Sequence, residues 1–102
     1  MLIDIDISLL TSKSAVGRVY GALEFPSLPR IGERVSLSVT GSSAVGFYDQ
    51  LTVEHVVYVP GAGSKVMLSL SDIVANDEGQ AKLLGEALEK TYGLFFEPYE
   101  NS

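Results

Sequence analysis

Apolar and polar side chains alternate near the start of the chain. Every second position of residues 3–9 is apolar, and the positions between them carry Asp4, Asp6 and Ser8. A period of two places one of these sets on each face of a β-strand. We therefore predict that residues 3–9 form a half-buried strand whose outer face carries the two aspartates.

A second alternating run occupies residues 15–25, after a polar turn. Two positions on its apolar face are Gly17 and Gly21. Glycine inside a strand usually marks a bulge or a tight corner, and a small closed barrel needs such corners. The pattern therefore favours a barrel or a strongly bent sheet over a flat one.

Prolines and a glycine interrupt the alternation after this strand. Pro26 and Pro29 lack the backbone N–H group that a strand ladder uses, and Gly32 suits a turn. The alternation resumes at residues 34–40, so we interpret residues 26–33 as a crossing loop into a third strand. A ligand-binding loop is the weaker alternative, because Gly and Pro serve turns more often than binding sites.

Two further strands are predicted on either side of a short turn at residues 60–64. Residues 47–59 are rich in β-branched and aromatic side chains. Alternation places four of these residues on the inner face: Leu51, Val53, Val57 and Val59. His55 would then also face the core, unless a bulge near it shifts the register. Residues 65–71 form the fifth strand, and the two strands should pair as a hairpin.

The period then changes to that of an amphipathic helix over residues 77–92. Asp77 and Gln80 resemble a capping box at its start, and Gly93 fits a left-handed C-terminal cap. Gly85 lies along the apolar stripe, where it would let the helix approach the sheet closely. The stripe consists of Ala81, Leu84, Leu88 and Tyr92.

Residues 94–102 form an aromatic tail. Exposed aromatic surface favours association, so we expect these side chains to be covered. In one explanation, Phe95 and Phe96 pack on the same domain as a short final strand. In the other, the tail docks on a second copy or on another protein, where aromatic anchors dominate the binding energy. The candidate interface residues are Leu94, Phe95, Phe96 and Tyr99.

Length and composition are typical of a single globular domain. The chain has 102 residues, of which 46% are hydrophobic and 20% are charged, and this suffices for a core without disulfides. We divide the domain into a β-barrel at residues 1–71, the helix, and the aromatic tail. The absence of cysteine excludes disulfides, thiolate metal sites and a cysteine nucleophile.

The charge of the chain narrows the range of partners. The formal net charge is -6 at pH 7, and the 7 Lys and Arg residues are scattered, whereas nucleic acids and anionic lipids are bound by clustered basic residues. No run approaches the roughly 18 apolar residues that cross a bilayer, and the first residues carry acids where a secretory signal carries Lys or Arg. We therefore expect a cytoplasmic protein without a nucleic-acid or membrane partner.

The single histidine limits the catalytic hypotheses. Zinc sites need three or four ligands, and a nucleophilic triad needs a histidine beside its serine. His55 lies inside an apolar strand and is more simply explained as a structural residue, whereas a hydrolytic pocket would combine it with Tyr58 and Glu54. Asp4 and Asp6, about 7 Å apart on one strand face, could hold a hard cation, but such acids more often solvate an outer face. We predict no catalytic residue, no metal and no cofactor.

The segment LPRIGERVSL, followed by LTVEHVVYV, a short turn and another strand, resembles small uncharacterised bacterial proteins with a compact SH3-like β-barrel. The resemblance covers residues 28–70. Nucleic-acid binders with such barrels are basic in the matching loops, and this chain is not. The predicted fold is mainly β (α+β), with a five- to six-stranded antiparallel SH3-like barrel or strongly bent sheet and one C-terminal α-helix packed on it.

The sequence is compatible with three functions. The first is a non-enzymatic binding or assembly module that contacts a protein partner or a second copy of itself in a homodimer, and an acidic chain suits a basic partner. The second is a small ligand-binding or hydrolytic barrel that uses His55. The third is a nucleic-acid-binding barrel. The aromatic tail favours the first.

Overall fold

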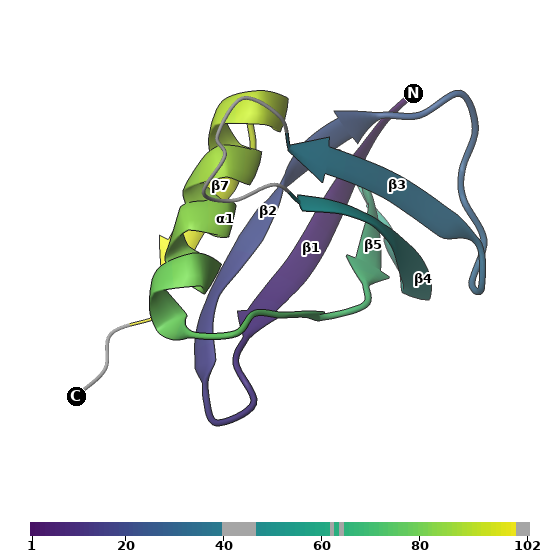
Figure 1. Cartoon of the computed structure of the whole chain (residues 1–102). Coiled ribbons are helices and arrows are strands. Elements are labelled where there is room, and N and C mark those ends of the chain that lie inside the picture. Colours follow the sequence, from purple (N-terminus) through teal and green to yellow (C-terminus); the bar gives the residue numbers. More distant parts are fainter. Residues whose placement is uncertain (40–46, 62, 64, 100–102) are drawn as a thin grey trace.

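The structure is a computed structural model that describes residues 1–39, 47–61, 63 and 65–99. It is mainly β, with a strongly curled open sheet that resembles half a barrel and one helix packed against it (Figure 1). In chain order the elements are β1 (Leu2–Leu10), β2 (Ala15–Glu24), β3 (Arg34–Val39), β4 (Phe47–Val59), β5 (Lys65–Leu70), β6 (Ile73–Val74), α1 (Glu78–Tyr92) and β7 (Phe95–Pro98).

Strand β1 runs through the middle of the sheet, whose strand order is β3-β4-β5-β1-β2-β7. It pairs antiparallel with β2 on one side. On the other side it pairs parallel with β5 and, farther along, with β6. Strands β5 and β6 therefore follow one another along the same edge of β1.

Two features of the predicted sheet were wrong. The sheet has 7 strands within the described residues, not five to six, and β1 has parallel as well as antiparallel neighbours. Strand β6 contains only 2 residues, which is too short to show an alternating pattern. The parallel pairing joins segments that are far apart in the chain, so no local pattern reveals it.

Strand β4 belongs to both halves of the sheet, because it pairs with β3 along one part of its length and with β5 along the other. Its residues 47–52 pair antiparallel with β3, and its residues 53–59 pair antiparallel with β5 in the predicted hairpin. A β-bulge between Val53 and His55 separates the two halves, and a bulge bends its strand. The chain therefore turns at this point, and side chains of β3 meet those of β1 in one core.

Beyond the bulge, the side chains at the end of β4 point to the opposite face from the one that we predicted. Val57 and Val59 are 45% and 48% exposed, whereas Val56 packs against the core. The prediction that Val57 and Val59 face inward was wrong, because one extra residue moves every later side chain to the opposite face. The bulge that we considered for His55 is confirmed, and His55 is exposed.

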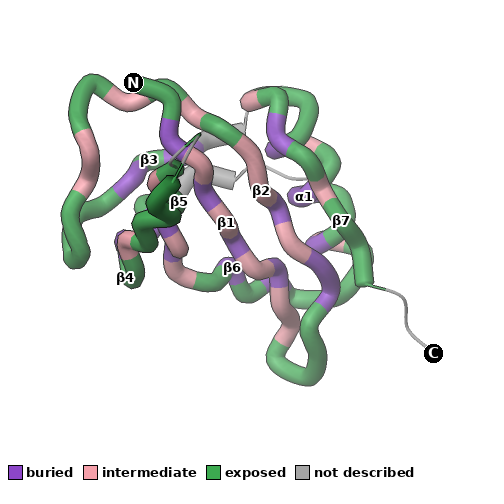
Figure 2. The backbone as a smooth tube through the Cα atoms, turned by 180° about the vertical axis from the view of Figure 1, so that it is seen from behind, coloured by how far each residue is buried: buried purple, intermediate pink, exposed green. Residues whose placement is uncertain are grey.

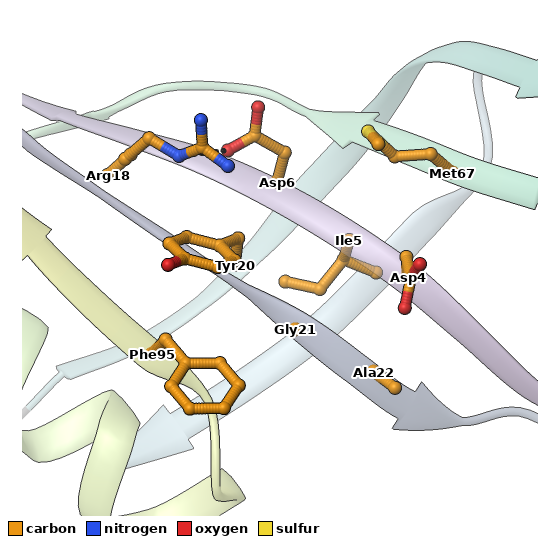
Figure 3. Close-up of a pocket in the computed structure, with 9 residues that line it drawn as sticks. All are labelled: Asp4, Ile5, Asp6, Arg18, Tyr20, Gly21, Ala22, Met67 and Phe95. Carbon is orange, nitrogen blue, oxygen red and sulfur yellow. Dashed lines mark ion pairs between the residues drawn. The ribbon is translucent and has the colours of Figure 1, made fainter.

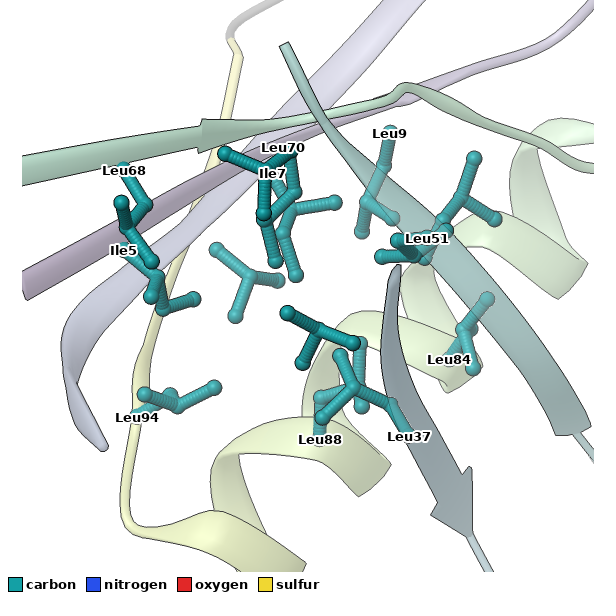
Figure 4. Close-up of a cluster of buried hydrophobic side chains, with 14 of the residues drawn as sticks. Ile5, Ile7, Leu9, Leu37, Leu51, Leu68, Leu70, Leu84, Leu88 and Leu94 are labelled. Atoms are coloured by element: carbon teal, nitrogen blue, oxygen red, sulfur yellow. The ribbon is translucent and has the colours of Figure 1, made fainter. Parts of the chain in front are cut away.

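The main apolar core lies between the inner face of the sheet and the helix (Figure 4). Strand β1 supplies every second residue to it, and the alternation between buried and intermediate positions is visible along the strand in Figure 2. Burying one such aliphatic side chain stabilises the fold by about 1.5–3 kcal/mol. The core residues of β1 are Ile3, Ile5, Ile7 and Leu9.

Helix α1 begins and ends at the predicted caps. The Asp77 side chain accepts a hydrogen bond from the backbone N–H of Gln80 at 2.8 Å, and the Gln80 side chain accepts one from the backbone N–H of Asn76 at 2.8 Å. At the other end, Gly93 adopts the left-handed conformation with φ 71°. This cap turns the chain so that Leu94 enters the core.

The ring of Phe96 attaches β7 to the rest of the fold. It lies over two glycines, one on β2 and one on α1. A Cβ atom added to Gly17 would lie 2.9 Å from the ring, and one added to Gly85 would lie 2.5 Å from it. Carbon atoms do not pack at such distances, so the ring occupies space that only glycine leaves free. Gly85 thus brings the helix close to the sheet, as predicted, and the contact is made at the edge strand β7.

We expect the substitution Gly85→Ala to lower the free energy of unfolding by about 1–2 kcal/mol. Overpacking against the Phe96 ring costs about 1–3 kcal/mol, and the better helix propensity of alanine offsets up to about 1 kcal/mol of this. Urea denaturation of the two proteins measures the difference.

The matched control is Gly79→Ala in the first turn of the same helix. An added Cβ there meets no ring, and its nearest neighbour is the N-cap oxygen Asp77 Oδ1 at 3.3 Å, so this variant should lose less stability than Gly85→Ala. In a Phe96→Leu background, Gly85→Ala should no longer destabilise the protein. Equal stability of Gly85→Ala and Gly79→Ala would show that the ring does not constrain the helix.

Candidate functional site

Five strands present outward side chains in one row across the sheet. Phe95 of β7 pairs with Tyr20 of β2, and Tyr20 pairs with Asp6 of β1. Asp6 pairs in turn with Ser69 of β5, and Ser69 pairs with His55 of β4. Residues paired across strands share a face. The row therefore crosses the outer face of the sheet, opposite the face that α1 covers.

A groove of about 320 Å³ lies on this outer face, over β1 and β2 (Figure 3). It combines apolar and aromatic side chains with three charged ones. This is the usual composition of a binding site, in which apolar walls provide contact area and a few polar groups fix orientation. The lining residues are Asp4, Ile5, Asp6, Arg18, Tyr20, Gly21, Ala22, Met67 and Phe95.

Arg18 extends along one side of the groove. Its guanidinium carbon lies 4.3 Å from the centre of the Tyr20 ring, which is within cation–π range. Its Nε atom lies 3.6 Å from Oδ1 of Asp6, which is too long for a hydrogen bond. Both atoms are shielded from solvent and make no hydrogen bond within the described residues. The charges therefore attract each other, but their hydrogen-bonding capacity is not fully used.

Phe95 and Tyr20 form an aromatic pair at the β7 side of the groove. Their ring centres are 5.6 Å apart and the rings are tilted by 30°. Phe95 is nevertheless 59% exposed. Its pairing with Tyr20 therefore leaves most of the Phe95 side chain available to another molecule.

Asp4 carries the second carboxylate of the groove. Its neighbours across the sheet are Ala22 on β2 and Met67 on β5, neither of which is charged. Among the residues that the structure describes, no ion pair or hydrogen bond of the Asp4 side chain is found. With Asp6 and Arg18, the groove therefore has one more negative than positive charge.

Exposed apolar side chains continue from the groove towards β4. Met67 is 37% exposed and pairs with Val57, which is 45% exposed. Val59, two residues farther along β4, is 48% exposed. These side chains extend the apolar surface of the groove across the outer face.

The candidate interface residues of the tail lie in different environments. Leu94 is 2% exposed and belongs to the core. Phe96 is half-buried against Gly17 and Gly85. Phe95 and Tyr99 are 59% and 40% exposed. Of these four residues, Phe95 and Tyr99 are therefore the two that are exposed to a partner.

The three residues of the candidate pocket are not brought together. Glu54, His55 and Tyr58 are all exposed, but His55 and Tyr58 are three positions apart on one strand and so face opposite sides of it. Tyr58 lines a separate shallow pocket of about 220 Å³ beside Val59 and Lys65. Within the described residues, no hydrogen bond or ion pair orients His55 as a catalytic base.

The described residues contain no group of three or more His, Asp or Glu side chains that could hold a metal ion. No helix in the described part of the chain is long and apolar enough to span a membrane.

The sequence predicted the positions of only some of the groove residues. The alternation of residues 3–9 put Asp4 and Asp6 on the outer face, where they are found. The approach of Arg18 and Met67 to these acids depends on strand register, and the parallel β1–β5 register is not readable from the sequence. The available signal was weaker: Arg18 and Tyr20 alternate with the apolar positions of β2 and so face outward.

We expect Leu94→Ala and Phe95→Ala to differ sharply in stability, although the residues are adjacent. Truncating a buried leucine to alanine lowers the free energy of unfolding by about 2–5 kcal/mol. Phe95→Ala should lower it by only about 1 kcal/mol, because it removes the contact with the Tyr20 ring. Thermal and urea unfolding of both variants tests this. Equal losses would mean that Phe95 is also a core residue, and the exposed aromatic surface would then not exist.

No protein-family model, curated protein or solved structure matches the chain. The chemistry of its own surface is therefore the basis for assigning a function.

Proposed function

We propose that this chain is a non-enzymatic binding module that acts through protein–protein contacts, and that the outer face of the sheet is its contact surface. The observation that carries this proposal is the exposure of Phe95, Met67, Val57 and Val59 around one groove. Helix α1 packs on the opposite face, and no described helix lies over the outer one (Figure 1).

Exposed apolar surface of this kind supports a protein partner. Single exposed apolar residues are common, but a contiguous group bordered by polar residues marks an interaction site. Aromatic side chains are the usual anchors of such sites, and the exposed Phe95 lines the groove at its β7 side. An edge strand also supports assembly, because β7 pairs with β2 along one edge only.

The distribution of charge supports a protein partner over a nucleic acid. The outer face combines Asp4 and Asp6 with Arg18, and the chain has a net charge of -6. Phosphate backbones are bound by several basic side chains acting together. The carboxylates of the groove would repel a phosphate placed there.

The hydrolytic alternative that uses His55 has less support. His55 lies at the far end of the outer row from Phe95 and does not line the groove. A general base needs a partner that orients it and a substrate site within hydrogen-bond reach. No described residue supplies such a partner to His55.

Membership of the small bacterial SH3-like proteins remains a proposal, as does a cytoplasmic location. Support for the first comes from the antiparallel unit β3-β4-β5, which falls within the resembling residues 28–70. Strand β1 joins this unit through its parallel pairing with β5, and β1 and β6 are additional to the unit.

The proposal is tested by removing apolar surface from each side of the molecule. Phe95→Ser and Met67→Ser alter the outer face, and the matched control Leu83→Ser alters α1, where Leu83 is 47% exposed. Each folded variant is immobilised and exposed to lysate of the native organism, and retained proteins are quantified by mass spectrometry. Sedimentation equilibrium of the same variants measures self-association.

We expect Phe95→Ser to weaken the binding of one retained protein, or the association of one homodimer, about tenfold or more, because the variant removes an aromatic anchor. Leu83→Ser should leave the interaction intact. Two results would overturn the proposal: equal loss in Phe95→Ser and Leu83→Ser, or a wild-type chain that retains nothing and stays monomeric.

A further inference from the structure

We infer that the groove binds a cationic side chain, arginine or lysine, that projects from a basic segment of a partner protein. The inference rests on the proposed function, because it identifies the chemistry of the partner at that same surface. Three features of the groove lead to it: its charge balance, its aromatic wall and its size.

The excess of negative charge in the groove favours a cationic ligand. Asp4 and Asp6 contribute two carboxylates, and Arg18 contributes one guanidinium. Arg18 is already engaged with Asp6 and Tyr20, while Asp4 has no cationic partner among the described residues. An added positive charge would neutralise the groove, whereas an added anion would face two carboxylates. The Asp6 side chain is 33% exposed, although its Oδ1 atom is buried, so Asp6 adds negative charge beside the incoming group.

The aromatic wall suits a guanidinium or an ammonium group with an aliphatic stem. Arg18 shows this recognition within the chain itself, with its guanidinium 4.3 Å from the centre of the Tyr20 ring and a carboxylate nearby. Phe95 offers a second, mostly exposed ring at the same groove. Lysine and arginine stems pack on apolar surface while the charged head reaches a polar partner. Met67 and Ala22 supply apolar surface beside Asp4 (Figure 3).

The size of the groove favours one side chain over a larger ligand. Its volume of about 320 Å³ is at the lower limit of small-molecule pockets, which span about 300–1,000 Å³. The apolar surface formed by Met67, Val57 and Val59 continues beyond it. A protein segment could therefore insert one basic side chain into the groove, while its adjacent side chains contact the apolar surface of Met67, Val57 and Val59.

Charge complementarity favours a different protein over a second copy. Two copies, each with a net charge of -6, repel one another. A basic segment is attracted by the same charge over a distance of about 8–10 Å at moderate ionic strength. We therefore assign the groove to a basic segment of another protein, and the experiment below distinguishes such a segment from a second copy.

The test uses the full chain and three blocked tripeptides: acetyl-Ala-Arg-Ala-amide, the lysine equivalent, and one with uncharged norleucine at the centre. Each is titrated into the ¹⁵N-labelled chain, and backbone amide shifts are followed. The variant Asp4→Asn removes the unpaired carboxylate without changing its shape. The matched control Asp72→Asn removes the same charge at an exposed position outside the groove.

We expect saturable shifts for the arginine and lysine peptides at residues 4–6, 18–22, 67 and 95. Their dissociation constants should be millimolar, as is typical of a single side chain, and about fivefold lower than that of the norleucine peptide. Asp4→Asn should remove this preference for the charged peptides over the norleucine peptide, and Asp72→Asn should preserve it. Added salt should weaken the binding of the charged peptides.

Four results would overturn the inference. The norleucine peptide could bind equally well, the shifts could map elsewhere, or Asp4→Asn could leave the preference unchanged. Concentration-dependent shifts at the groove without peptide would also overturn it, because they would identify a second copy as the occupant. The proposed function is judged separately: if Phe95→Ser abolishes partner retention while the peptides show no preference for positive charge, the binding surface stands and only the cationic occupant is lost.

Discussion

The structure depends on the placement of one aromatic ring between a strand and a helix. Phe96 lies over Gly17 of β2 and Gly85 of α1, in space that any larger residue would fill. This contact fixes the last strand to the sheet. Because successive strand residues face opposite sides, burying Phe96 places Phe95 on the outer face, next to Tyr20. The aromatic wall of the groove is thus a consequence of a packing constraint on the other side of the sheet.

The two faces of the sheet divide the molecule by chemistry. The inner face is aliphatic and is covered by α1, which accounts for the stability of the fold. The outer face carries Asp4, Asp6 and Arg18 among exposed apolar side chains. An ion pair whose closest atoms are 3.6 Å apart and an exposed ring add little to folding, so their arrangement is better explained by recognition of another molecule than by stability.

Local patterns predicted the parts of the fold that depend on local physics. Alternation identified β1 and its outward aspartates, and the capping residues Asp77 and Gly93 gave the ends of α1. The bulge before His55 could be named only as an alternative, and it inverts the end of β4. The groove could not be predicted as a unit, because it requires the registers of β1 with β2 and β5 and of β2 with β7, and strand register between distant segments is a property of the assembled sheet.

The parallel neighbours of β1 have a consequence for the order of folding. The β1–β2 hairpin needs only residues 2–24 and can form early, but the other edge of β1 is completed by residues 65–74. Loop closure over so long a segment is slow compared with hairpin formation. On the ribosome, the backbone N–H and C=O groups along this edge of β1 therefore stay unpaired until residues 65–74 have been synthesised. The aspartates that alternate along this strand would then keep the nascent edge from pairing with other chains.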